Sequence, residues 1–371
     1  MEFTGGVDRG SPFRFRDPQV ASRILDSIKK LGITARYMHV CGTHQDTLVK
    51  YGLEPLLNSA GVEVRAGPGC PVCVTTGLEF EEAIALAEAG KTIAAFGDVA
   101  RAPGFNRSLL DVRSEGCKVT IVYSVRDAVK LAERRGEPVI FMAVGFETTA
   151  PTTAAVLMES PPENFYILSC HRLIPPAVKA LLELGEIRLN GLIQPGHVST
   201  IIGLDPYSEI STRYRIPQVI AGFEPLDLLM AVYMLSKQLV EGRYEVENEY
   251  IRTVKPNGNV RARKLIEEVF TPCDVAWRGF PQIKGSGLKL RPEFEAYDAR
   301  AAFQDVLENV HERFQGLGDP PGCRCGEVLR GVLEPRDCPL FGVRCIPQTP
   351  VGPCMVSVEG TCYIRYRYGE A

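Results

Sequence analysis

Half of the cysteines of this chain lie near its C-terminal end, and their spacing could support metal or redox chemistry. The sequence holds 12 cysteines. Those near the end follow the pattern C-x-C-x12-C-x6-C-x8-C-x7-C, and they are Cys323, Cys325, Cys338, Cys345, Cys354 and Cys362. Prolines and glycines surround them, so this segment cannot build a large apolar core. We therefore expect its thiols to hold it together.

Three kinds of thiol chemistry compete for this segment. Disulfides suit small secreted domains, whereas this chain is long and shows no signal peptide. Zinc sites usually combine two C-x2–4-C pairs, and the segment contains none. An iron–sulfur cluster accepts four thiolates at irregular spacing. Ligand chemistry therefore favours a cluster over zinc or disulfides, and two cysteines remain that could form a redox pair beside it.

Another cysteine follows an expected strand near the start of the chain. Residues 35–40 are typical of a buried strand, which leads directly into Cys41-Gly42-Thr43-His44 and then a helical segment. Ligands gather at the carboxyl ends of strands in open α/β sheets, and a helix N-terminus favours a thiolate. Cys41 is thus a candidate catalytic or metal-binding residue, with His44 near the same ligand. A buried, inert cysteine is the alternative interpretation.

The next two expected strands also end in residues that could do chemistry. Residues 61–66 lead into a proline- and glycine-stiffened loop with the C-x-x-C pair Cys70 and Cys73. This spacing favours a redox dithiol, and half of a metal site is the second interpretation. The strand at 92–96 is followed by Asp98. Its carboxylate could orient or deprotonate a group at the strand ends, or simply cap a helix.

The alternation of strands and helices predicts an α/β fold. Further strands are expected at residues 119–123, 138–144, 164–169, 191–194 and 218–221. The alternation stops near Gly242, and residues 245–254, 259–270 and 303–314 are expected to be helical.

This pattern predicts two Rossmann-like parallel-sheet domains and a smaller, Cys-rich iron–sulfur domain. The expected division is a leader at 1–17, a first α/β domain at 18–120 with Cys41 and Cys70/Cys73, a second α/β domain at 121–242, and a helical, Cys-rich domain at 243–371.

The composition indicates a globular protein that acts in the cytoplasm. Hydrophobic residues make up 45% and charged residues 23% of the chain, and the net charge is −3. This charge gives no reason to expect nucleic acid or an anionic membrane as partner. No apolar run approaches the roughly 18 residues that span a bilayer, and the start of the chain has no apolar export signal. A cysteine-rich cytosolic chain is expected to use its thiols for metal or redox work.

Taken together, these motifs resemble those of the hydrogenase maturation factor HypD family. The resemblance spans about residues 18 to 371, and the leader before Pro18 is not matched. It is carried by Cys41–His44, Gly67–Cys73, Phe96–Asp98, Gly145–Thr149, His171-Arg172, Pro195–Thr200, Gly222–Pro225, Gly322–Gly326, Pro353–Ser357 and Glu359–Cys362.

The resemblance implies a redox-active scaffold for metallocentre assembly in [NiFe]-hydrogenase maturation, rather than a conventional turnover enzyme. Family members combine with the small chaperone HypC and hold an iron ion. Cyanide from HypE and a carbon monoxide are added to that iron, which gives Fe(CN)2CO. By this resemblance Cys41 is the expected iron ligand, with His44 beside it, and Cys70 and Cys73 form the redox dithiol.

For the tail, the resemblance implies a [4Fe–4S] cluster next to a thiol pair. The expected cluster ligands are Cys323, Cys338, Cys345 and Cys362, and the expected redox pair is Cys325 and Cys354. Two other functions remain open from the residues alone. One is a self-contained thiol–disulfide oxidoreductase that acts on proteins through Cys70/Cys73, and the other is a zinc-stabilised interaction protein.

Overall fold

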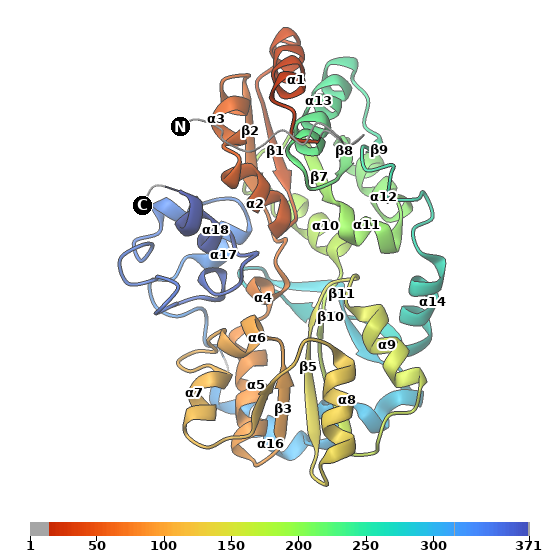
Figure 1. Cartoon of the computed structure of the whole chain (residues 1–371), viewed down its shortest axis with the longest axis vertical. Helices are drawn as coiled ribbons and strands as arrows, with labels where there is room; N and C mark the ends of the chain where they lie inside the picture. The colour runs from red at the N-terminus through yellow and green to blue at the C-terminus, as the bar shows by residue number, and fades with distance from the viewer. Residues whose placement is uncertain (1–14, 315, 370–371) are drawn as a thin grey trace.

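The computed structural model describes residues 15–314 and 316–369 of the 371-residue chain (Figure 1). Most of the expected leader, residues 1–14, lies outside the described residues. Its last residues are bound to the fold. The Leu226 amide donates a hydrogen bond to the Phe15 carbonyl at 3.1 Å, and Arg16 pairs with Glu224 through two contacts of 2.5 and 3.0 Å.

A first parallel sheet, sheet A, has the strand order β2-β1-β7-β8-β9. Its strands are β1 (Ala35–His39), β2 (Val62–Ala66), β7 (Gly191–Pro195), β8 (Gln218–Ala221) and β9 (Val246–Asn248). The helices around it are α1 (Pro18–Lys30), α2 (Gly42–Lys50), α3 (Leu53–Asn58), α10 (Ile174–Leu184), α11 (Gly196–Ile202), α12 (Asp205–Tyr214) and α13 (Pro225–Glu241). The helices α1 and α13 pack together over one apolar face that includes Ile28, Tyr37 and Leu229.

A second parallel sheet, sheet B, has the strand order β4-β3-β5-β6. Its strands are β3 (Thr92–Ala95), β4 (Val119–Ile121), β5 (Val139–Gly145) and β6 (Phe165–His171). One face packs on α5 (Gly77–Glu88), α7 (Leu109–Ser114) and α16 (Gln304–Phe314). The other face packs on α8 (Val125–Arg134), α9 (Ala150–Met158) and α14 (Val260–Val269). The seven residues of β5 are all buried, as expected for a strand covered on both faces.

An antiparallel hairpin of β10 (Phe270–Ala276) and β11 (Gln282–Leu290) packs against β6 and α10. The Ser169 hydroxyl donates to the Leu288 carbonyl at 2.6 Å and fixes this contact. A 3-10 helix (Pro292–Tyr297) and the short helix α15 (Ala299–Ala302) connect the hairpin to α16.

The Cys-rich tail forms a small body of turns beside α2 and α4 (Figure 1). Its elements are α17 (Cys325–Leu329), two 3-10 helices (Pro335–Asp337 and Pro353–Met355) and α18 (Thr361–Tyr368). The helix α4 spans Pro71–Val74, and α6 spans Gly97–Arg101. The Arg365 guanidinium donates two hydrogen bonds, of 2.6 and 2.8 Å, to the Glu54 carboxylate. These bonds attach α18 to α3.

The α/β fold and its parallel sheets agree with the sequence prediction, but the strands are grouped differently from the expected division at residue 120. That position falls inside β4, and sheet B continues to β6. Sheet A joins β1 and β2 to β7, β8 and β9, so sheet B is inserted between two halves of sheet A. Alternation along the chain reveals how many strand–helix units exist, but it does not reveal which strands pair.

The region after Gly242 also differs in part from the prediction. Residues 259–270 and 303–314 contain the expected helices, α14 and α16. The expected helix at 245–254 is wrong, because Val246–Asn248 is the edge strand β9. Hydrogen bonds from Gln218 N to Glu245 O (3.0 Å) and from Glu249 N to Ile220 O (2.9 Å) align this segment with β8, and they favour the strand.

No helix among the described residues is both long and apolar enough to cross a membrane.

Candidate functional site

Cys41 and the C-x-x-C loop lie side by side because the strands before them pair. The strands β1 and β2 are parallel neighbours, so their carboxyl ends meet at the same sheet edge. The Gly42 amide donates to the Gly69 carbonyl at 3.2 Å. A Cβ on Gly69 would lie 2.2 Å from the Cys41 nitrogen. Only glycine allows the two loops to approach this closely.

The Cys-rich tail closes over the Cys41 loop. A Cβ on Gly42 would lie 2.4 Å from both the Cβ and the carbonyl oxygen of Glu359. Cys41 is only 8% exposed, and burial, followed by the charge of Glu359, raises the pKa of its thiol to about 11. The amides of Thr43 and His44, at the start of α2, donate hydrogen bonds to this thiol and oppose that shift. Cys41 is therefore a buried side chain between two parts of the chain.

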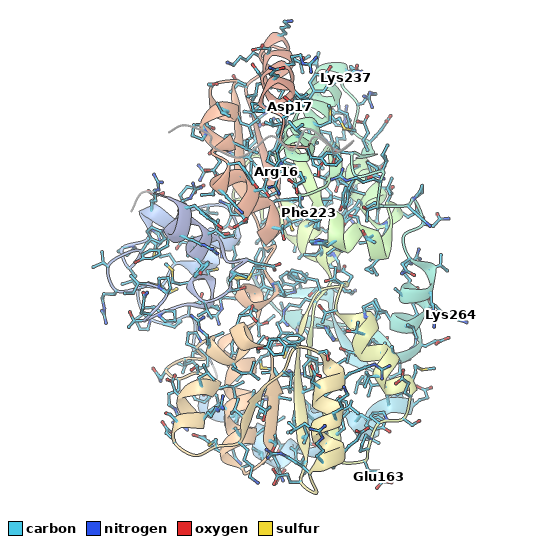
Figure 2. All side chains as sticks on the ribbon, in the orientation of Figure 1. Arg16, Asp17, Glu163, Phe223, Lys237 and Lys264 are labelled. Carbon is cyan, nitrogen blue, oxygen red and sulfur yellow. A yellow bond between two sulfur atoms is a disulfide. The ribbon has the colours of Figure 1, made fainter. Side chains whose placement is uncertain are left out.

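His44 is buried beneath an aromatic stack. Its Nε2 lies 3.3 Å from the Ala221 carbonyl, and because a carbonyl only accepts, this nitrogen carries the proton. Its Nδ1 has no hydrogen-bond partner among the described residues. The centre of its ring lies 5.2 Å from the centre of the Phe223 ring, which belongs to the turn between β8 and α13 (Figure 2). The His197 ring stacks on the Phe223 ring with a centre-to-centre distance of 3.8 Å. Burial, and to a smaller extent the charge of His39, lowers the pKa of His44 to about 3. Its imidazole is therefore neutral near pH 7.

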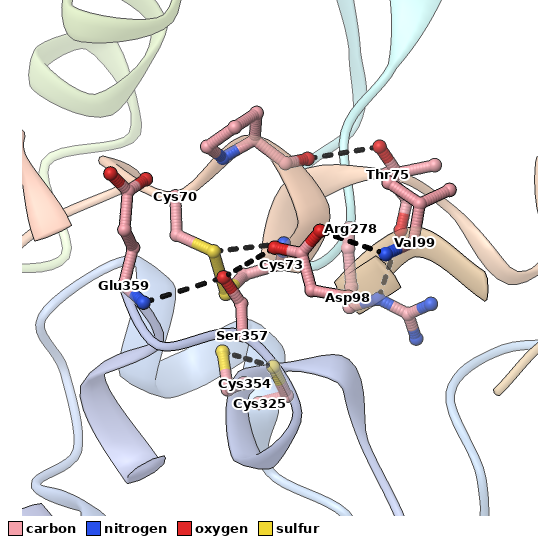
Figure 3. The surroundings of a disulfide bond; sticks show 11 residues. Cys70, Cys73, Thr75, Asp98, Val99, Arg278, Cys325, Cys354, Ser357 and Glu359 are labelled. Atoms are coloured by element: carbon pink, nitrogen blue, oxygen red, sulfur yellow. Dashed lines mark hydrogen bonds between the residues drawn. A yellow bond between two sulfur atoms is a disulfide. The ribbon is translucent and has the colours of Figure 1, made fainter. Parts of the chain in front are cut away.

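Cys70 and Cys73 form a disulfide at the start of α4, with their Cα atoms 5.3 Å apart (Figure 3). Their exposed fractions are 3% and 0%. The Cys73 amide donates to the Cys70 sulfur at 3.2 Å, so Cys70 is also the N-cap residue of this short helix. The predicted ability of these residues to close a disulfide thus agrees with the geometry.

Asp98 lies in the first turn of α6 and binds the tail. The Ser357 hydroxyl donates to its Oδ2 at 3.1 Å, and the Glu359 amide donates to the Ser357 hydroxyl at 3.3 Å. Burial and then the charge of Asp98 raise the pKa of Glu359 to about 7. Figure 3 shows Asp98, Ser357 and Glu359 around the disulfide, with Cys325 and Cys354 below them.

Four tail thiols form a continuous series of contacts. The sulfurs of Cys325 and Cys354 lie 2.7 Å apart, and both residues are buried. Cys323 hydrogen-bonds to Cys325, and Cys362 hydrogen-bonds to Cys354. Hydrogen bonds from Cys323 and then Cys354, with the charge of Arg278 nearby, hold the pKa of Cys325 well below its usual range.

The other two tail cysteines lie close by. Cys345 interacts electrostatically with Cys362 and Cys325, and its sulfur accepts a hydrogen bond from the Val351 amide at 3.3 Å. Cys338 lies within electrostatic range of Arg324. Thiolates are the donors that iron–sulfur clusters use, so the chemistry of these residues fits the expected cluster. Within residues 15–314 and 316–369, no group of three or more side chains is already arranged at metal-binding distances.

Two contributors to the site were not expected from sequence. Ser357 and Glu359 belong to the motifs that carry the resemblance, but no role was predicted for either. Their contacts with Asp98 and Gly42 depend on the tail folding back onto α2 and α6, which spacing along the chain does not reveal. A serine and a glutamate between Cys354 and Cys362 were the available signal.

Comparison with known proteins identifies the family. The HypD family profile, described as the hydrogenase formation hypA family, matches residues 19–369. A putative hydrogenase expression/formation protein of Methanocaldococcus jannaschii is 48% identical, covering 95% of this chain and 98% of its own. The hydrogenase maturation factor HypD of Rhizobium leguminosarum is 42% identical (96% and 94% covered), and that of Escherichia coli is 40% identical (96% and 97% covered). This chain therefore belongs to the HypD family of hydrogenase maturation factors.

Proposed function

We propose that this chain is the cytoplasmic scaffold on which the Fe(CN)2CO group of [NiFe]-hydrogenases is assembled, and that its thiols conduct the electrons for this assembly. In this proposal it acts together with a HypC-type chaperone and a HypE-type cyanide donor. The iron that receives cyanide and carbon monoxide is cargo, held on the protein only until it is passed on.

One observation carries the proposal: the tail segment 357–360 contacts both the Cys41 loop and the neighbourhood of the Cys70–Cys73 disulfide. Glu359 packs on Gly42, and Ser357 binds Asp98. Cys354, three residues before Ser357, contacts Cys325. The thiol proposed to bind iron, a disulfide and a buried thiol pair thus share one region, and this proximity supports a role that couples metal binding to redox chemistry.

Cys41 is the proposed ligand for the cargo iron. Low-spin iron with cyanide ligands is soft, and it favours a thiolate over an oxygen donor. The amides at the start of α2 point at the sulfur and stabilise its negative charge. His44 stays neutral beneath this loop, and its free Nδ1 is an acceptor beside the same site.

The remaining thiols are proposed to handle electrons. When Cys70 and Cys73 close to the disulfide, they release two electrons and two protons, which suits the reductive release of cyanide from a sulfur-bound carrier. Cys325 and Cys354 are the proposed second pair. The proposed [4Fe–4S] cluster on Cys323, Cys338, Cys345 and Cys362 would supply one-electron transfer when bound.

The burial of the disulfide bears on the first alternative function. A self-contained oxidoreductase that acts on other proteins needs a sulfur that its substrate can reach. Cys70 and Cys73 are almost fully covered, so an internal electron partner fits better than a protein substrate. The second alternative, a zinc-stabilised interaction protein, is tested by the zinc and iron content of the purified protein.

The experiment is anaerobic co-expression with a HypC-type chaperone and a HypE-type donor, followed by infrared spectroscopy of the purified complex. The proposal predicts cyanide and carbon monoxide bands from bound iron. Cys41→Ala removes these bands, whereas the matched control Cys117→Ala, which changes a thiol outside the site, retains them. Bands of equal strength in the Cys41→Ala complex would exclude Cys41 as the iron ligand.

A further inference from the structure

We propose that the tip of the Cys-rich tail is a docking surface for a small, acidic one-electron carrier protein. The tip is defined here as residues 342–344 together with Arg101. This inference rests on the proposed electron-conducting role of the tail, and it names the kind of partner that would supply the electrons.

The tip combines an exposed apolar side chain with positive charge. Val343 is 78% exposed, and Arg344 beside it is also exposed. Arg101 reaches the turn that follows residues 342–344, because its Nη2 donates to the Pro347 carbonyl at 3.4 Å. Among the ion pairs formed by described residues, none includes Arg101 or Arg344, so both charges remain available to a partner.

The charge of this surface differs from that of the whole chain. The net charge of the protein is −3, yet residues 338–358 include no aspartate or glutamate and one arginine. A positive patch on a protein of net negative charge attracts negatively charged partners to that patch in particular. The predicted partner is therefore acidic.

The tip forms a hydrogen-bonded turn next to the tail thiols. The amides of Val343, Arg344 and Cys345 all donate to the Leu340 carbonyl, at 3.3, 3.1 and 2.8 Å. Gly342 adopts a positive φ of 70°, and its amide donates to the Cys345 carbonyl at 3.2 Å, which closes the turn. Cys345 directly follows Arg344 and interacts electrostatically with Cys325 and Cys362. A partner on the tip is therefore adjacent to the cysteines that are proposed to hold the cluster.

The small size of the surface fits a transient partner. Electron-transfer encounters are among the smallest protein interfaces, and charge steering rather than buried area sets their rates. The step itself moves one electron. The carrier would lose one electron and the proposed [4Fe–4S] cluster, when bound by the tail cysteines, would gain it, with no bond or proton exchanged.

The chain offers a matched control for the test. Val260 and Arg261 form a second exposed valine–arginine pair on α14, which lies on the opposite side of the molecule in Figure 1. The test variant is Val343→Asp/Arg344→Glu, and the control variant is Val260→Asp/Arg261→Glu. Both change the net charge equally, so a difference between them reports the location of docking.

Binding of purified acidic ferredoxin and flavodoxin to the full chain is measured at low and high salt. The proposal predicts that at least one carrier binds, that salt weakens the complex, and that the tip variant loses about tenfold in affinity while the control keeps it. Equal losses in both variants, unchanged binding by the tip variant, or no binding of either carrier to the unaltered chain would overturn it.

Reduction by dithionite separates this inference from the proposed function. Dithionite needs no docking surface, so it should reduce the tail equally in the unaltered chain and in both variants. If the tail accepts no electrons from dithionite in any of them, the electron-conducting role fails, and the binding result still decides the docking surface.

Discussion

Glu359 lies directly against Gly42, so closely that a Cβ on the glycine would come within 2.4 Å of the glutamate backbone. This contact joins the Cys-rich tail to the loop that carries Cys41, although the two are far apart in sequence. The tail covers Cys41 and also binds Asp98. A movement of the tail would therefore change the surroundings of the proposed iron ligand.

The first prediction concerns this close approach. Gly42→Ala should push Glu359 away and destabilise the protein by about 1–3 kcal/mol, because neither backbone can yield freely. Urea denaturation measures the loss. Gly136→Ala is the control, since its Cβ would meet nothing within 4 Å, and it should leave stability unchanged or slightly raised. Equal stability of the two variants would contradict the close packing of the tail.

The second prediction concerns the anchor of α18. Glu54→Ala removes the carboxylate that accepts two hydrogen bonds from Arg365. It should lower the free energy of unfolding by about 1.5–3 kcal/mol, because both side chains are largely buried. Glu159→Ala breaks an exposed pair with Arg126 and should leave stability almost unchanged, because water screens exposed charges. Thermal unfolding of both variants compares them. A larger loss from Glu159→Ala would be inconsistent with this account.

The third prediction is a pH dependence at Glu147. Burial raises the pKa of this carboxyl from 4.5 to about 7, and its Oε1 accepts a hydrogen bond from the Ile174 amide at 2.9 Å. The folded state then binds more protons than the unfolded state between these two pH values. The carboxyl therefore contributes stability below pH 4.5, and this contribution is lost as the pH rises through 7.

Glu147→Gln removes this titration. As the pH rises from 4.5 to about 7, the free energy of unfolding of the unaltered chain should fall by up to about 3 kcal/mol relative to that of the variant. Urea titrations at several pH values measure the difference. A difference that stays constant, or that grows with pH, would show that Glu147 is not held in its neutral form.

The fourth prediction is the number of titratable thiols in the isolated chain. Alkylation under denaturing, chelating conditions without a reductant should modify ten cysteines, because Cys70 and Cys73 are joined. Added reductant should raise the number to all 12. In Cys73→Ser the partner Cys70 is free, so the number should not depend on the reductant. Mass spectrometry counts the labels, and a reductant-independent count in the unaltered chain would argue against the disulfide.

Local sequence patterns predicted the strands that precede the candidate site residues. The strands before Cys41, Cys70 and Asp98 are short, apolar and followed by glycine-containing turns, so they could be identified from the chain alone. The possible disulfide followed from the C-x-x-C spacing. These predictions succeeded because each depends on a few neighbouring residues.

Long-range arrangement could not be predicted in the same way. The insertion of sheet B between β2 and β7 depends on pairing between strands that are distant in sequence. The edge strand β9 resembled a helix because its burial comes from packing beside β8 rather than from a clear alternation. The roles of Ser357 and Glu359 appear only when the tail folds onto α2 and α6.

The iron, sulfide and zinc content of the anaerobically purified unaltered chain and of Cys41→Ala tests most directly whether one chain has two separate metal-binding sites. Both proteins should contain about four irons and four sulfides per chain and show a brown absorbance, because the tail cysteines are proposed to hold the cluster independently of Cys41. One zinc and no colour, or loss of the absorbance in Cys41→Ala, would contradict it.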